Sequence, residues 1–185
     1  MEIRKAKAED VDVVIPLLLE ALGGTAPAFC GTEIPREIEA TYRQYFAEEK
    51  GRFSYHQFFV ALEGGKICGM IAGHETNQLE QLNQRIYDQL LRRGKGDFEL
   101  LIESMEGDYF IEVLAVAEAC RSQGIGKKII TFFEKEGRRR ICKQISLVVL
   151  QENEEAKKLY EKLGYQVQNA HSFYFEDFYY MAKKS

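Results

Sequence analysis

The stretch CRSQGIGKK, residues 120–128, has the residue types and spacing of a turn that binds an anion. Gly124 and Gly126 lack a Cβ atom, so the main chain there can approach another group closely. The turn follows an apolar run and precedes an amphipathic one, so it opens a helix. Amide groups from about Ser122 to Lys127 would then point outward at the positive end of the helix dipole, which favours a phosphate. Tight packing of strand against helix is the alternative explanation for the glycines.

Two well-known phosphate motifs do not fit this turn. A Walker loop needs Ser or Thr after Gly126-Lys127 and a glycine five residues before Gly126, but the chain has Lys128 and Arg121 there. The dinucleotide fingerprint GxGxxG needs a third glycine where the chain has Ile129. The turn therefore indicates an anion site of another kind.

Glu112 is a candidate general base because it interrupts the otherwise apolar run FIEVLAV. A carboxylate in such a strand is paired, solvated or used in chemistry. Partial burial would raise its pKa toward a value useful for accepting a proton. A structural salt bridge, or a carboxylate at a strand end in water, is the alternative.

Tyr160 and Asn153 belong to the segment NEEAKKLYEKLG, which predicts a helix ending at Gly164. Asn153 precedes two glutamates and is typical of a helix N-cap. Tyr160 lies at helical spacing with apolar residues, which is typical of a core tyrosine whose hydroxyl is satisfied locally.

Alternating patterns predict one α/β or α+β domain over residues 1–185. Residues 77–106 form a helical insertion, with one stripe of Leu79, Leu82, Ile86 and Leu90 and a shorter helix around FELLIESM. That stripe favours packing on its own domain. The expected strands are 1–6, 56–62, 66–75, 109–116, 145–150 and two within 165–183; the expected helices are 9–22, 36–49, 125–137 and 154–164, with a loop at 23–35.

Composition restricts the partners and the compartment. The net charge of −4 argues against nucleic acid, and we expect no membrane association because no apolar run approaches the ~20 residues of a membrane helix. The N-terminus has no signal-peptide core, and the four cysteines are scattered without a CxxC pair. We therefore expect reduced thiols in a cytoplasmic protein, with no metal site and no cysteine nucleophile.

The motifs in residues 109–166 together resemble the GNAT superfamily of acetyl-CoA-dependent N-acetyltransferases. The spacing Arg121-x-x-Gly124-x-Gly126 matches that family's acetyl-CoA signature, and Asn153, Ala156, Tyr160 and Gly164-Tyr165 follow in the family's order. The resemblance implies a mixed, mostly antiparallel sheet, flanked by helices and splayed between its fourth and fifth strands. Dimers are common in this family, and a homodimer is left open.

The resemblance implies acetyl-CoA as the donor and no metal. The turn would hold the pyrophosphate, with the Arg121 side chain as a helper, and the pantetheine arm would pair with the backbone near residues 114–116. The expected cofactor-binding residues are Leu114, Ala115, Val116, Arg121, Ser122, Gln123, Gly124, Ile125, Gly126, Lys127, Asn153 and Tyr160.

In the implied mechanism an acceptor amine attacks the thioester directly, with Glu112 as base, directly or through water, and Tyr160 as acid. The acceptor would be a primary amine of a small molecule, peptide or protein. The acidic stretch with Glu103, Glu106, Asp108 and Glu112 either attracts a cationic amine or is an ordinary solvated surface. A non-catalytic acyl-CoA-binding module and a transferase of a longer acyl group are the alternatives.

Overall fold

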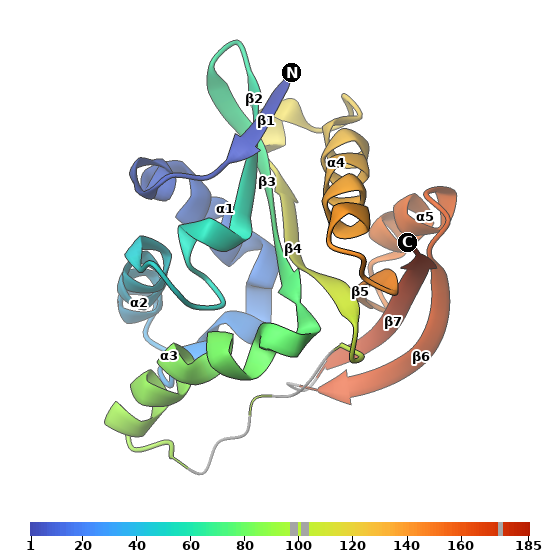
Figure 1. Cartoon of the computed structure of the whole chain (residues 1–185). Coiled ribbons are helices and arrows are strands. Elements are labelled where there is room, and N and C mark those ends of the chain that lie inside the picture. The colour runs from blue at the N-terminus through green and yellow to red at the C-terminus, as the bar shows by residue number, and fades with distance from the viewer. Residues whose placement is uncertain (97–99, 101–103, 174–175) are drawn as a thin grey trace.

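The computed structural model describes residues 1–96, 100, 104–173 and 176–185, and seven strands in this part of the chain form one sheet (Figure 1). The strand order is β1-β2-β3-β4-β5-β7-β6. Every neighbouring pair is antiparallel except β4 and β5, which are parallel. The strands are β1 (Glu2–Lys5), β2 (Phe58–Glu63), β3 (Lys66–Glu75), β4 (Asp108–Val116), β5 (Gln144–Leu150), β6 (Gln166–Phe173) and β7 (Glu176–Lys184).

Helices cover both faces of this sheet (Figure 1). One face carries α1 (Val11–Leu22), α2 (Pro35–Ala47) and α3 (Leu79–Arg92), and the other carries α4 (Ile125–Arg139) and α5 (Glu154–Lys162). Each helix buries apolar residues in the core on its own face of the sheet, so the protein has one core on each face. The mixed, mostly antiparallel α/β fold expected from the sequence is confirmed, and its elements lie within a few residues of their expected positions.

The segment after α1 is helical, so the expectation of a loop over residues 23–35 was partly wrong. Gly23 ends the α-helix with a φ of +51°, and a 3₁₀-helix, η2 (Gly23–Phe29), continues from it. Two tyrosines of α2 hold this segment, because Tyr42 donates to the Ala26 carbonyl at 3.2 Å and Tyr45 to the Phe29 carbonyl at 2.9 Å. These contacts come from a distant part of the chain, so no local sequence pattern predicts them.

The segment Ala8–Phe29 is long and apolar enough, by length and composition alone, to cross a membrane. The expectation that no apolar run reaches such a length was therefore wrong, because α1 is extended at both ends by 3₁₀ turns. Within α1, Val14, Ile15, Leu17 and Leu18 are buried, and the helix packs on β3 and β4. A core helix passes the same test of length and composition.

The insertion between β3 and β4 carries α3, whose apolar stripe is buried on the chain itself. Leu79, Leu82, Ile86 and Leu90 are all buried, as the stripe predicted. Arg85 of α3 also donates to the Glu48 carboxylate at the end of α2, at 2.6 Å. The shorter helix expected around FELLIESM falls mostly on residues outside the described part of the chain.

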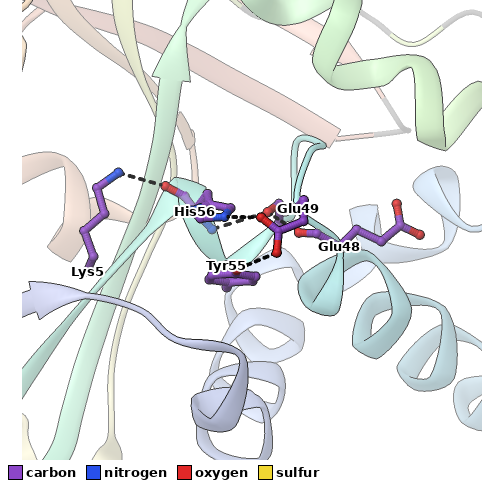
Figure 2. A network of polar contacts seen from close by, with 6 residues as sticks. Lys5, Glu48, Glu49, Tyr55 and His56 are labelled. Atoms are coloured by element: carbon purple, nitrogen blue, oxygen red, sulfur yellow. Dashed lines mark hydrogen bonds and ion pairs between the residues drawn. The ribbon is translucent and has the colours of Figure 1, made fainter.

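A polar network joins the end of α2 to the start of β2 (Figure 2). Glu49 is bound both by His56 Nε2, at 2.9 Å, and by the Tyr55 hydroxyl, at 3.0 Å. These hydrogen bonds lower the pKa of Glu49, with that of His56 the largest cause, and the bond to Glu49 raises the pKa of Tyr55. Lys5 of β1 donates to the His56 carbonyl at 3.2 Å, which extends the network to the edge of the sheet.

Candidate active site

The turn between β4 and α4 presents a row of free backbone amides. Ser122 and Gly124 both have left-handed backbone conformations, with φ of +62° and +73°. The first helical bond of α4 runs from the Lys128 amide to the Gly124 carbonyl, at 3.2 Å. In the described part of the chain, the amides from Ser122 to Lys127 have no protein acceptor. Successive amides around left-handed residues form a concave anion site at the positive helix end.

This turn faces a cavity of about 860 Å³ between β4, α4 and α5. Its residues fit coenzyme A, because free amides and lysine side chains suit a pyrophosphate and apolar groups of β4 suit the pantetheine arm. The lining comprises Glu20, Ala21, Leu114, Ala115, Val116, Cys120, Arg121, Ser122, Gly124, Ile125, Gly126, Lys127, Asn153, Glu155, Ala156, Lys158, Leu159 and Lys162. We call it the cofactor cavity.

Two of the residues expected to bind the cofactor are engaged elsewhere. Arg121 donates from Nε to the Val116 carbonyl at 3.1 Å, and its guanidinium forms an ion pair with Glu20. The Gln123 side chain donates to the Ala119 carbonyl at 3.3 Å and does not line the cavity. In this structure the backbone of the turn, rather than these side chains, is available to an anion.

β4 and β5 separate beyond their first half, as the expected splay requires. Their parallel pairing ends at Ile111 opposite Leu147, although both strands continue. A second cavity of about 190 Å³ lies where they part, and Glu112 and Tyr160 both line it. We call it the acceptor cavity. It adjoins the cofactor cavity, since Ala21, Leu114, Asn153 and Ala156 line both.

A β-bulge in β4 sets the direction of Glu112. Ala72 of β3 pairs with Val113 and Gly73 pairs with Ile111, so Glu112 has no residue opposite it. The alternation of side chains changes phase there, because Ile111 and Leu114 belong to the core under α4 while Val113 belongs to the core under α1. Bulges commonly redirect a side chain next to a functional site.

The Glu112 carboxylate is buried and paired. Its Oε2 lies 2.8 Å from Arg52 Nε and 3.6 Å from His74 Nδ1. Arg52 also stacks over the Phe29 ring, 5.0 Å from its centroid. A buried cation at this distance stabilises the ionised carboxylate, so the salt-bridge alternative for Glu112 describes the geometry seen here.

His74 lies in the same cluster as a neutral ring. Burial lowers its pKa to about 4, with the Arg52 charge adding to the effect and Glu112 opposing it. In the described structure neither ring nitrogen has a hydrogen-bond partner. The cluster thus combines the Arg52–Glu112 ion pair with an uncharged His74 ring.

Tyr160 presents a protonated hydroxyl to the acceptor cavity. Burial raises its pKa to about 12, and its ring packs edge-on against Tyr165 at 5.8 Å between centroids. Its hydroxyl makes no hydrogen bond to any residue that the structure describes. Asn153 caps the same helix, accepting from the Ala156 amide at 3.0 Å, as its position in the sequence indicated. Tyr160 and Asn153 thus both belong to α5 or its cap and line the acceptor cavity.

The acidic stretch before β4 does not line the acceptor cavity. Asp108 is buried, where it accepts a hydrogen bond from Ser146 Oγ at 2.6 Å and another from the Tyr180 hydroxyl. Glu106 is exposed, and Glu103 lies outside the described residues. Among the described residues of this stretch, Glu112 is the one that lines the cavity.

Three residues near Glu112 or at the acceptor cavity were not among the site residues expected from the sequence. Arg52 and His74 reach Glu112 from other strands and loops, and Glu176 lines the acceptor cavity from β7. Nothing local marks these residues, since each is an ordinary charged or polar residue in its own segment. Among the described residues, no three His, Cys, Asp or Glu side chains converge as a metal site would require.

A sheet with this strand order, split at a parallel pair beside free amides, defines the class of acyl-CoA-dependent transferases. The model of the acetyltransferase (GNAT) family matches residues 26–165, and the chain belongs to this family. No curated protein matches the chain.

Solved structures share the whole fold at low sequence identity. An N-acetyltransferase from Staphylococcus aureus Mu50 matches with a TM-score of 0.83 and 19% identity, covering 99% of this chain and 100% of its own. A crystallised acetyltransferase matches with a TM-score of 0.79 and 20% identity, covering 100% of this chain and 99% of its own. The ribosomal-protein-S18-alanine N-acetyltransferase of Escherichia coli matches with a TM-score of 0.61 and 16% identity, covering 99% of this chain and 92% of its own. At these identities the likeness concerns the fold alone.

Proposed function

We propose that this protein transfers the acetyl group of acetyl-CoA directly to a primary amine of a small molecule or a peptide. One observation carries the proposal. The unpaired amides from Ser122 to Lys127 face a cavity that adjoins a second cavity, and Tyr160 presents its hydroxyl there. The arrangement supplies a pyrophosphate site, a space for an acceptor and a proton donor between them.

The donor would be held mainly by the main chain. The six amides and the Lys127 side chain would bind the pyrophosphate, while Lys158 and Lys162 of α5 add positive charge. The pantetheine arm would lie along the edge of β4 from Leu114 to Val116, where β5 has diverged. Holding the thioester beside the acceptor in this way converts a bimolecular encounter into a positioned reaction.

The proton of the attacking amine would leave toward Glu112, and the departing thiolate would receive the Tyr160 proton. Glu112 is almost fully enclosed and bound to Arg52, so a water molecule between amine and carboxylate suits this geometry better than direct transfer. Tyr160, with its pKa raised to about 12, keeps its proton until the thiolate forms. In this proposal both groups contribute to turnover more than to cofactor affinity.

The proposal extends to the whole chain and its compartment. All seven strands of the described chain join one sheet, which supports a single domain over residues 1–185. The four cysteines carry free thiols, which supports a reducing cytoplasmic location.

Calorimetry with acetyl-CoA and a CoA-release screen over amines, peptides and polyamines test the proposal. We expect association with acetyl-CoA and acetylation of at least one class of amine. Absence of binding would remove the proposed donor. Binding without transfer to any amine would favour the non-catalytic module, and faster transfer from propionyl-CoA would favour a longer acyl donor.

A further inference from the structure

The two adjoining cavities carry opposite charge. In the cofactor cavity Arg121, Lys127, Lys158 and Lys162 outnumber Glu20 and Glu155, which suits the phosphates of a nucleotide. In the acceptor cavity the charged lining residues of the described chain are Glu112 and Glu176, and both are acidic. The charge therefore changes sign from the donor side to the acceptor side.

Of the two acidic residues, Glu176 is the one without a counter-charge among the described residues. Glu112 is neutralised by Arg52 at 2.8 Å. Glu176 has no ion pair and no hydrogen bond to any residue that the structure describes, and it is partly exposed. A carboxylate in a partly enclosed space attracts a cation more strongly than one in open water.

The position of Glu176 places this charge at the wall of the cavity formed by β7 and η2. Glu176 begins β7, and Phe178, two residues further on the same face, also lines the cavity. Its carboxylate lies over Gly24 of η2, because a Cβ atom added to Gly24 would be 3.5 Å from Glu176 Oε1. A Cβ atom at position 24 would make only an ordinary van der Waals contact with this carboxylate.

Resting on the proposed function, we propose that Glu176 determines acceptor specificity by binding a second positive charge of the substrate. The reacting nitrogen must be neutral to attack the thioester, so it cannot remain paired with Glu176 as a cation. The positive charge that pairs with Glu176 therefore has to be another group of the same substrate molecule. The substrate class is thus an amine that carries a further cationic group a short chain away, such as an aliphatic diamine. Glu176 contacts the substrate without taking part in the proton transfers.

Matched acceptors test this assignment. Cadaverine and n-hexylamine, and likewise putrescine and n-pentylamine, differ by replacement of one ammonium group by a methyl group. We expect the wild-type protein to show a kcat/KM at least ~10-fold higher for each diamine, the size of one charge-assisted contact. Glu176→Gln should lower kcat/KM for the diamines ~10- to 100-fold, and at least ~10-fold more than for the monoamines.

Three further variants sharpen the test. Glu176→Asp keeps the charge and should retain a preference for diamines, while Glu176→Lys should reverse it. Glu152→Gln makes the same charge change at an exposed residue that lines neither cavity, and it should keep the wild-type preference. Thermal unfolding of each variant shows whether it is folded.

The outcomes separate this inference from the proposed function. Equal kcat/KM for diamines and monoamines in the wild type, or equal losses for both in Glu176→Gln, would overturn the inference; equal losses would indicate a proton-transfer role. Acetylation of monoamines alone would overturn it and leave the proposed function standing. Acetyl-CoA binding without acetylation of any amine would overturn both.

Discussion

Arg52 and Glu112 form a buried ion pair that links a loop to the bulge of β4. Arg52 Nε lies 2.8 Å from Glu112 Oε2, with side chains only 2% and 3% exposed. The two residues are 60 positions apart in the chain. Glu112 of this pair lines the acceptor cavity, so it has a structural role in addition to its proposed catalytic one.

Glu112→Gln should therefore lower both stability and turnover. The substitution breaks the buried ion pair with Arg52 by removing one of its charges, and such changes typically cost ~3–5 kcal/mol in the free energy of unfolding. If Glu112 also accepts the proton, kcat should fall ~100-fold or more while the Kd for acetyl-CoA changes little. Denaturant unfolding and CoA-release kinetics measure the two effects.

A double variant separates the two roles of Glu112. Glu112→Gln combined with Arg52→Met removes both members of the pair, and with the two single variants it completes a cycle that measures their coupling energy. Its turnover should stay low, because the carboxylate is still missing. Recovery of turnover together with stability would show that Glu112 acts on the reaction through structure only.

Tyr160→Phe tests the proposed proton donor. The change removes one hydroxyl that makes no hydrogen bond within the described chain, so the fold should keep its stability to within ~1 kcal/mol. We expect kcat to fall ~10- to 100-fold because the thiolate loses its donor, with an unchanged Kd for acetyl-CoA. Tyr165→Phe is the matched control, since Tyr165 packs against Tyr160 but lines neither cavity. Similar rates in both variants and the wild type would exclude Tyr160 as the acid.

Gly126→Ala separates cofactor binding from folding. Its backbone is not in the left-handed region, and an added Cβ would lie 3.7 Å from Val116 Cγ2, an ordinary contact. The free protein should thus be as stable as the wild type or up to ~1 kcal/mol more stable, as alanine favours helix. The methyl group lies in the cofactor cavity, so the Kd for acetyl-CoA should rise ~10-fold or more. An unchanged Kd by calorimetry would contradict the placement of the pyrophosphate.

Gly124→Ala is the contrasting variant. Gly124 has a φ of +73° and open space where a Cβ would lie, so the substitution is opposed by backbone strain rather than by contact. We expect a loss of ~1–2 kcal/mol in the free protein. A thermal-shift comparison of the two glycine variants without ligand shows the difference.

His74 makes stability depend on pH. In the folded protein the pKa of His74 is lowered from 6.5 to about 4. Between these two pH values the unfolded chain binds a proton at His74 that the folded protein does not bind. The contribution of neutral His74 to the free energy of unfolding is fully present above pH 6.5. It is lost as the pH falls toward 4, and the loss amounts to about 3 kcal/mol in total. His74→Leu should flatten this part of the profile, whereas His171→Leu, at an exposed residue, should not. Denaturant unfolding at a series of pH values compares the slopes; equal slopes in His74→Leu and the wild type would contradict the assignment.

Local patterns in the sequence were sufficient for the family and for most of the elements. The glycine turn, the Asn153 cap and the apolar periodicities each depend on residues close together in the chain, so their meaning is readable without the fold. The strand β3, Lys66–Glu75, was expected with its observed bounds for this reason. The 3₁₀-helix at Gly23–Phe29 was not, because tyrosines of another helix hold it.

What surrounds Glu112 was decided only by tertiary structure. The sequence marked this residue as unusual in its strand, but the bulge opposite Gly73 and the pairing with Arg52 arise when distant strands and loops meet. The same holds for Glu176, an unremarkable residue in its own segment that becomes a free charge at the acceptor cavity through the packing of β7 beside η2. Electrostatic environment depends on neighbours in space, and the linear order of residues does not specify them.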